Sequence, residues 1–178
     1  MRKIILSIMV SVDGFIESRT PEEDWFNWNE EMGEYMTGLM NNCDAFIYGR
    51  KSYQLMLQYW PQATGDFADI MNGKPKLVFS KTLKTVEWNS TLMTDVNKAE
   101  IEDLKSRPGK DMVLFAGADI ASAFIKEGLI DEFRLIVNPI VLGGGKPLFT
   151  HITENLNLQL KSAKAFECGN VLLTYWPK

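Results

Sequence analysis

The residues of this 178-residue chain best suited to chemistry follow an apolar run at residues 45–48. Gly49 turns the chain there, and Arg50, Lys51 and Ser52 stand where apolar side chains begin to recur at helical spacing. The first turn of a helix offers unpaired backbone N–H groups and the positive end of the helix dipole, which favour an anion. Arginine adds a bidentate donor for phosphate, and lysine adds a point charge. The segment therefore predicts a site for a phosphate-bearing ligand, although a β–α turn with a solvated Arg-Lys pair has the same pattern.

Two further predicted strands end in similar polar or glycine turns: residues 76–80, which finish in Ser80, Lys81 and Thr82, and residues 112–116, which are followed by Gly117, Ala118 and Asp119. Asp119 is expected to cap a helix that continues to residue 127. In open α/β sheets, ligands bind beside the carboxyl ends of the strands. Three consecutive glycines at residues 143–145 would let backbone approach closely or turn sharply.

Two other features precede the first helix. A strand at residues 4–12 runs into Asp13, which either caps the turn through the local backbone or faces a substrate. A polar loop at residues 17–29 then carries Trp25, Phe26 and Trp28. Aromatic side chains on an irregular segment either wall a pocket or cover one end of the core.

The elements that must position these residues are predicted from periodicity and breakers. Nearly continuous apolar runs indicate strands that are covered on both faces, as in a largely parallel sheet between helices. The expected strands are residues 4–12, 45–48, 76–80, 86–88, 91–93, 112–116 and 133–137, and a closing antiparallel hairpin joins residues 156–166 to 171–176. Helices are expected over residues 30–41, 52–59, 66–71, from 97 to 108, and up to 127.

Composition bounds the class of protein. With 46% hydrophobic and 24% charged residues, the chain is expected to be one globular domain, residues 1–178. The net charge of −4 argues against a nucleic-acid surface, and no apolar run is long enough for a membrane span. Cys43 and Cys168 lie far apart, so we expect no metal site and a reducing, cytoplasmic location. His151 is the only histidine, and no nucleophile elbow is present.

The order of these segments resembles that of the dihydrofolate reductase-like superfamily. It is most similar to the C-terminal reductase domain of the bacterial bifunctional riboflavin-biosynthesis deaminase/reductase and to its stand-alone relatives. The resemblance spans nearly the whole chain and is carried by residues 11–16, 49–52, 80–83, 117–119 and 139–149. It implies a three-layer α/β/α fold with a mixed, mostly parallel sheet, a C-terminal antiparallel hairpin, and a homodimer.

The resemblance also implies a reductase that transfers hydride from NADPH, or from NADH, to a small heterocyclic or carbonyl substrate, with no nucleic acid or membrane as partner. Its cofactor-binding residues would be Met9, Val10, Ile16, Gly49, Arg50, Lys51, Ser52, Ser80, Lys81, Thr82, Gly117, Ala118, Asp119, Ile120 and Gly144. Trp25 and Tyr48 would lie near the substrate, and Asp13, or water that it orders, would supply the proton.

The sequence departs from that family in three places. Ala116 takes the first of two glycine positions after the third strand. Asp119 would repel a pyrophosphate unless it caps the helix. Gly33 stands where folate reductases carry the carboxylate that protonates a pterin, so folate reduction is disfavoured. Two alternatives remain open: a nucleotide- or pterin-binding homodimeric module without turnover, and a flavin-binding or purely structural dimer.

Overall fold

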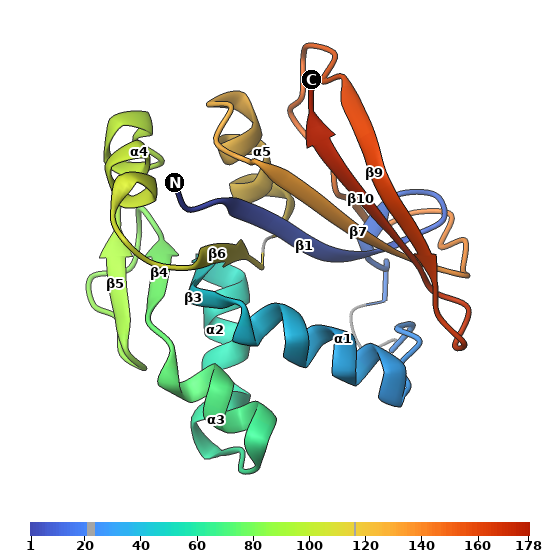
Figure 1. Ribbon diagram of the computed structural model, residues 1–178, viewed down its shortest axis with the longest axis horizontal. Coiled ribbons are helices and arrows are strands. Elements are labelled where there is room, and N and C mark those ends of the chain that lie inside the picture. Colours follow the sequence, from blue (N-terminus) through green and yellow to red (C-terminus); the bar gives the residue numbers. More distant parts are fainter. Residues whose placement is uncertain (21–23, 116) are drawn as a thin grey trace.

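A computed structural model describes residues 1–20, 24–115 and 117–178. Within these residues an eight-stranded sheet has the order β5-β4-β3-β6-β1-β7-β10-β9, with helices on both faces (Figure 1). Its strands are β1 (Ile4–Ser11), β3 (Cys43–Gly49), β4 (Lys76–Phe79), β5 (Ser90–Met93), β6 (Asp111–Leu114), β7 (Glu132–Asn138), β9 (Leu158–Ala165) and β10 (Val171–Pro177). The helices are α1 (Glu30–Asn41), α2 (Arg50–Tyr59), η1 (Trp60–Gln62), α3 (Asp66–Gly73), α4 (Lys98–Ser106) and α5 (Ala118–Lys126).

The sheet is parallel from β5 to β7, and β10 then pairs antiparallel with β7 and with β9. The predicted α/β class, the mostly parallel sheet and the closing antiparallel hairpin are therefore confirmed. The register places Gly49 opposite Phe79 and Ile47 opposite Leu114. Hence the carboxyl ends of β3, β4 and β6 meet at one edge of the sheet.

Alternation along the central strands divides the core into two layers. Ile4 and Leu6 of β1 face α4 and α5, where Phe124 is fully buried. Ile5 of β1 and Phe46 of β3 face the opposite way, toward the apolar sides of α1, α2 and α3. Strands covered on both faces explain why their sequences read as continuous apolar runs.

The helix ends follow ordinary capping rules. Asn29 precedes α1, and its side chain accepts a hydrogen bond from the backbone N–H of Met32 at 3.0 Å. Gly128, with φ +66°, follows the end of α5, where an L-residue would be strained. In the described ranges, no helix is both long enough and apolar enough to cross a bilayer.

Three local predictions were wrong. Residues 86–88 form no strand, because Trp88 and Asn89 adopt positive φ values of 62° and 51° and lead into β5, which pairs parallel with β4. Helix α2 begins at Arg50 rather than Ser52, so both cations lie in its first turn. The cap of α5 is Gly117, and Asp119 lies inside the first turn.

A small second sheet was not predicted. Strand β2 (Phe15–Glu17) pairs antiparallel with β8 (Lys146–Pro147), which brings Glu17 opposite Lys146. Elements of three and two residues are too short for any periodicity to appear in the sequence. This ribbon joins the loop after β1 to the segment that follows the three glycines.

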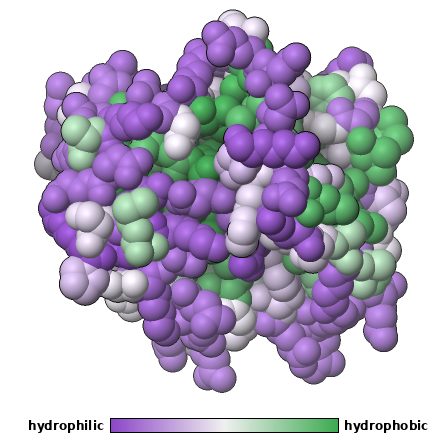
Figure 2. Space-filling view, turned by 45° about the horizontal axis from the view of Figure 1, so that its top comes forward, coloured by the Kyte–Doolittle hydropathy of each residue, from purple (hydrophilic) through white to green (hydrophobic). Residues whose placement is uncertain are grey.

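The surface agrees with the composition. On the face shown in Figure 2 the surface is largely hydrophilic, and apolar side chains gather in a hollow and along one side. Scattered exposed apolar residues are normal, whereas gathered ones often mark a site of interaction.

Candidate active site

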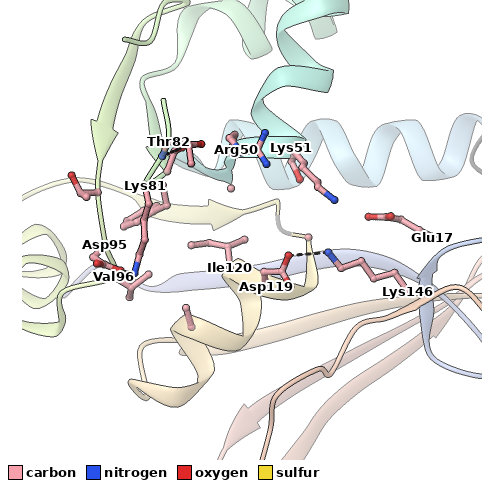
Figure 3. Close-up of a pocket in the computed structure, with 17 residues that line it drawn as sticks. Glu17, Arg50, Lys51, Lys81, Thr82, Asp95, Val96, Asp119, Ile120 and Lys146 are labelled. Carbon is pink, nitrogen blue, oxygen red and sulfur yellow. Dashed lines mark hydrogen bonds and ion pairs between the residues drawn. The ribbon is translucent and has the colours of Figure 1, made fainter. Parts of the chain in front are cut away.

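A cavity of about 370 Å³, here called the polar cleft, opens at the edge where β3, β4 and β6 end (Figure 3). It is walled by the turns after those strands, by the segment after β5, and by the β2–β8 ribbon. Its lining residues are Glu17, Gly49, Arg50, Lys51, Ser52, Phe79, Ser80, Lys81, Thr82, Thr94, Asp95, Val96, Gly117, Asp119, Ile120, Ala123 and Lys146. Three turns that are far apart in the sequence are thus brought together.

The N-termini of two helices meet in the polar cleft. Gly49 caps α2 and Gly117 caps α5, and neither terminus has a side-chain hydrogen bond to its backbone N–H groups. A Cβ on Gly49 would lie 3.1 Å from Cγ2 of Ile120, and one on Gly117 would lie 3.9 Å from Oγ of Ser52. Glycine at residue 49 therefore allows the two helices to start close together, with both sets of N–H groups available to an anion.

The charges in the polar cleft are partly balanced. Lys81 pairs with Asp95 at 2.9 Å, and Lys146 pairs with Asp119 at 3.0 Å. The latter pair neutralises the carboxylate that would otherwise repel a phosphate at the start of α5. Neither cation in the first turn of α2 forms an ion pair with another described residue, so that turn keeps its positive charge.

The turn after β4 is held by its own hydrogen bonds. The Ser80 hydroxyl accepts from the backbone N–H groups of Thr82 at 3.2 Å and Leu83 at 3.0 Å. The Ser80 backbone N–H in turn donates to the carbonyl of Met93 at 2.9 Å. This turn is therefore ordered before any ligand arrives, which lowers the entropy cost of binding.

A second cavity of about 570 Å³, here called the apolar cavity, lies beside the polar cleft. Glu17, Ser52 and Gly117 line both, so the two spaces adjoin at these residues. The remaining lining residues are Ser7, Ile8, Met9, Ile16, Ser18, Trp25, Phe26, Trp28, Met36, Leu55, Met56, Phe115 and Ile136. Aromatic and aliphatic walls with a few polar groups are typical of small-molecule sites.

The structure places the predicted cofactor residues in three groups. Those in the polar cleft are Gly49, Arg50, Lys51, Ser52, Ser80, Lys81, Thr82, Gly117, Asp119 and Ile120. Met9 and Ile16 line the apolar cavity instead, together with the predicted substrate residue Trp25. Val10, Ala118 and Gly144 are buried and are not among the lining residues of either space. Gly144 lies under the guanidinium of Arg19.

Asp13 lies in a turn, outside the lining of both spaces. Its carboxylate accepts from the Ser11 hydroxyl at 2.6 Å and from the backbone N–H groups of Leu142 at 3.1 Å and Gly143 at 2.8 Å. The Ser11 hydrogen bond is the main reason that the pKa of Asp13 lies below its usual value. A carboxylate held in this way orders the loop and is a poor proton donor, so its catalytic role stays a prediction without support from this geometry.

Tyr48 also lines neither space. Its ring is fully buried and stacks near Trp88 and Phe115, and its hydroxyl has no partner among the described residues. Burial raises the pKa of Tyr48 above its usual value. A side chain with no exposed surface cannot contact a substrate without rearrangement, so the geometry gives Tyr48 a place in the core. Strand alternation explains this, since Tyr48 points to the same side as Phe46.

Sequence reasoning missed four polar or charged residues of the polar cleft, and also its apolar residues Phe79, Val96 and Ala123. Thr94 and Asp95 follow β5, and Glu17 and Lys146 belong to the β2–β8 ribbon. Thr94 and Asp95 could have been found, because they follow a predicted strand, residues 91–93, just as the other polar turns follow theirs. Glu17 and Lys146 carried no comparable signal.

The remaining candidate groups lie elsewhere. In the part of the chain that the structure describes, no three histidine, cysteine, aspartate or glutamate side chains cluster as metal ligands would. Burial raises the pKa of the Cys43 thiol to about 11, which leaves it unreactive. His151 is exposed, with φ +57°, outside both spaces.

A family model described as the RibD C-terminal domain matches residues 2–172 of the chain. The chain belongs to the RibD C-terminal domain family. The uncharacterized protein YyaP of Bacillus subtilis (strain 168) is 38% identical over 179 residues, which cover 98% of this chain and 94% of YyaP.

Two solved structures have the same fold. A putative riboflavin biosynthesis protein from Shewanella sp. PV-4 superposes with a TM-score of 0.79 at 25% identity, covering 100% of this chain and 99% of that one. Dihydrofolate reductase from Enterococcus faecalis, in complex with NADP(H), superposes with a TM-score of 0.67 at 11% identity, covering 99% and 96% of the two chains. The predicted dihydrofolate reductase-like fold and the riboflavin-reductase resemblance are therefore confirmed.

Two of the three departures lie in the described residues: Asp119, which pairs with Lys146, and Gly33, which stands where folate reductases carry a carboxylate. Gly33 lies on α1 against Trp28 and does not line the apolar cavity. Of the nearby carboxylates, Glu31 is engaged by Lys164 at 2.9 Å and by the backbone N–H of Glu167. No carboxylate of α1 lines the apolar cavity among the described residues. The third departure, Ala116, lies outside the described residues.

Proposed function

We propose that this protein is a nicotinamide-dependent reductase that transfers a hydride from NADPH, or from NADH, to a small heterocyclic or carbonyl substrate. The observation that carries the proposal is that the polar cleft and the apolar cavity adjoin at Glu17, Ser52 and Gly117, which line both. A dinucleotide needs donors for its phosphates beside a largely apolar space in which its reacting ring can meet an acceptor.

The residues of the polar cleft fit such a cofactor. A pyrophosphate would be held by the free backbone N–H groups at the starts of α2 and α5, which no side chain caps, and by the two cations in the first turn of α2. Glycine at residue 49 keeps the space open, because a Cβ there would crowd Ile120 of α5. The ordered turn after β4 presents the hydroxyl of Thr82 and the amine of Lys81 to the same cleft. When bound, a reduced nicotinamide supplies the hydride, and the protein supplies position and exclusion of water.

Glu17 is the residue that we assign to proton delivery. Of the described residues that line both spaces it is the only titratable one, and Figure 3 shows its carboxylate pointing into the gap beside Lys51 and Lys146. A carboxylic acid or the water that it orders can protonate the atom next to the one that receives hydride. Asp13 does not line either space, and its carboxylate oxygens accept hydrogen bonds from Ser11, Leu142 and Gly143.

The comparisons support the proposal at the level of class. Membership of the RibD C-terminal domain family favours an oxidoreductase, and a protein of the same fold binds NADP(H). The predicted homodimer and cytoplasmic location remain proposals, and sedimentation of the purified chain tests the first.

Titration with nucleotides tests the binding half of the proposal. Trp25 and Trp28 line the apolar cavity, so their fluorescence should be quenched by NADPH and left unchanged by FMN. Loss of the reduced-nicotinamide absorbance on addition of an acceptor then tests turnover. Quenching by FMN alone would contradict the proposal and favour the flavin-binding alternative.

A nucleotide- or pterin-binding module without turnover is the second candidate. It is favoured by the engagement of Asp13 in its loop and by the lack of an α1 carboxylate in the described lining of the apolar cavity. NADPH binding without oxidation by any acceptor would favour it. The module without turnover would be excluded if the natural chain oxidises NADPH and if Glu17→Gln loses this turnover while it keeps its affinity for NADPH.

A further inference from the structure

The apolar cavity has a charge pattern that restricts what it can bind. Among its described lining residues, Glu17 is the only charged one, and it stands where the cavity meets the polar cleft. The residues outside the described ranges (Pro21, Glu22, Glu23 and Ala116) bring no positive charge by sequence. Lys51 and Lys146 line the polar cleft and not this cavity. An anionic group inside the cavity, away from those two lysines, would be desolvated with no cation in the described lining, which is strongly unfavourable.

Two nearby cations are already engaged. The guanidinium of Arg19 donates to the carbonyl of Gly143 at 2.9 Å. Arg134 donates to Glu132 at 2.6 Å, and neither arginine is among the residues that line the cavity. Recruiting one of them for a phosphate would require breaking these contacts.

The walls favour a flat ring. Trp25 is almost fully buried and packs on Phe26 with ring centroids 4.3 Å apart, while Met9 and Met36 supply adaptable apolar surface. Phe26, Trp28 and Leu55 remain exposed by 45%, 53% and 62%. Exposed apolar side chains gathered along a cavity indicate a surface that a ligand covers.

One buried polar group in the cavity lacks a partner. Ser7 is 3% exposed, and its hydroxyl makes no hydrogen bond to any described residue. It lies on β1 next to Ile8 and Met9, which line the same cavity. A buried hydroxyl without a partner destabilises the free protein, so a ligand that supplies a partner gains that hydrogen bond.

We infer that the substrate is a flat, uncharged ring compound with a hydrogen-bonding group that reaches Ser7, and that acceptors carrying a phosphate or carboxylate are rejected. This deepens the proposed function and rests on it, since the cavity is identified as the acceptor site of a reductase. The preference for an uncharged substrate comes from the lack of a cation in the described lining of the cavity as much as from the contacts that the lining offers.

A matched pair of probes tests this inference by calorimetry on the full chain, with and without NADP⁺. Quinoxalin-2-one is flat and neutral, and 3-oxo-3,4-dihydroquinoxaline-2-carboxylate adds one negative charge to the same ring. The neutral probe should bind about 10-fold more tightly or better, because the carboxylate is desolvated without a cation.

Two variants sharpen the test. Ser7→Ala should weaken binding of the neutral probe about 3- to 10-fold, which corresponds to one uncharged hydrogen bond, and should leave the thermal midpoint of the free protein unchanged or raised. Ser122→Ala is the matched control, because Ser122 is equally buried but bonds to Thr150 on α5's side of the sheet and lines neither space. Leu55→Arg, at an exposed position of the wall, should improve binding of the carboxylate probe.

Equal or tighter binding of the carboxylate probe, no detectable binding of the neutral probe, or unchanged affinity in Ser7→Ala would overturn the inference. These results leave the proposed reductase intact if NADPH still binds and is oxidised. Conversely, if the chain distinguishes the two probes but does not bind NADPH, the proposed reductase function is refuted. The inference that the cavity binds an uncharged ligand would then still stand.

Discussion

The polar cleft and the apolar cavity adjoin, but they are built in different ways. The polar cleft uses the backbone of helix starts and the polar residues that follow parallel strands, so the topology of the sheet alone brings them together. The apolar cavity is made mostly of side chains from β1, β2, α1, α2, β7, the loop before α1 and the segment after β6. Under the proposed function, the edge that binds phosphate can persist while the neighbouring walls change, so cofactor recognition and acceptor choice would be set by separate parts of the molecule.

The largest expected effect is one that damages both spaces at once. Gly145 has φ +134°, and a Cβ there would lie 2.0 Å from the carbonyl oxygen of Glu17. Gly145→Ala should displace the β2–β8 ribbon, lower the free energy of unfolding by about 3 kcal/mol and weaken both NADPH and the neutral probe. Chemical denaturation and calorimetry measure the two effects.

Gly143→Ala is the matched control for that variant. Its φ is +66°, and nothing lies within 4 Å of the added Cβ, so only the left-handed backbone costs free energy, about 1 kcal/mol. If Gly145→Ala lowered affinity for only one of the two ligands, the ribbon would not be a shared wall.

Arg50→Ala should affect the polar cleft alone. Charged hydrogen bonds contribute about 1.5–3 kcal/mol, so NADPH affinity should fall about 10- to 100-fold while binding of the neutral probe is unchanged. Arg107→Ala is the control, since Arg107 is exposed, lines neither space and pairs with Asp103. Unchanged NADPH affinity in Arg50→Ala would count against the phosphate assignment.

Trp25→Leu should affect the apolar cavity alone. Loss of an aromatic wall is expected to weaken the neutral probe about 3- to 10-fold and to leave NADPH affinity nearly unchanged. Trp176→Leu removes a partly exposed tryptophan that lines neither space and serves as the control. A larger effect of Trp25→Leu on NADPH than on the probe would reverse the roles of the two spaces.

The smallest effect lies outside both spaces, at the opposite end of β4. Lys76 is fully buried over the ring of Trp88, and burial lowers the pKa of Lys76 to about 8. Because the folded pKa lies below the unfolded value, the folded state binds fewer protons, and stability rises with pH between about 8 and 10.5. Lys76→Met should abolish this dependence, so its stability relative to the natural chain should decline by about 1 kcal/mol from roughly pH 7 to pH 9.

Denaturant unfolding across that pH range measures this difference, and NADPH affinity should not change. If the free energy of unfolding of Lys76→Met, relative to that of the natural chain, stayed constant or increased with pH, the proposed cost of burying the ammonium would be contradicted.

The polar cleft and the apolar cavity also differ in how far the sequence predicts them. The turns after β3, β4 and β6 were predictable, because an apolar run followed by glycine and polar residues is a local pattern. The walls of the apolar cavity were only partly predictable: Met9, Ile16 and Trp25 were assigned near it, but Ser7, Met36 and Met56 depend on which faces of β1, α1 and α2 meet. The resemblance placed Tyr48 near the substrate, and the alternation of a strand covered on both faces does not show which side faces a ligand.

The most direct test is a crystal structure of the full chain soaked with NADP⁺. The phosphates are expected to contact the helix starts at Arg50 and Ala118, and the nicotinamide to lie between Glu17, Ser52 and Gly117 at the mouth of the apolar cavity. A nucleotide bound elsewhere on the surface, or one whose nicotinamide points away from the apolar cavity, would contradict the assignment of this cleft as the active site.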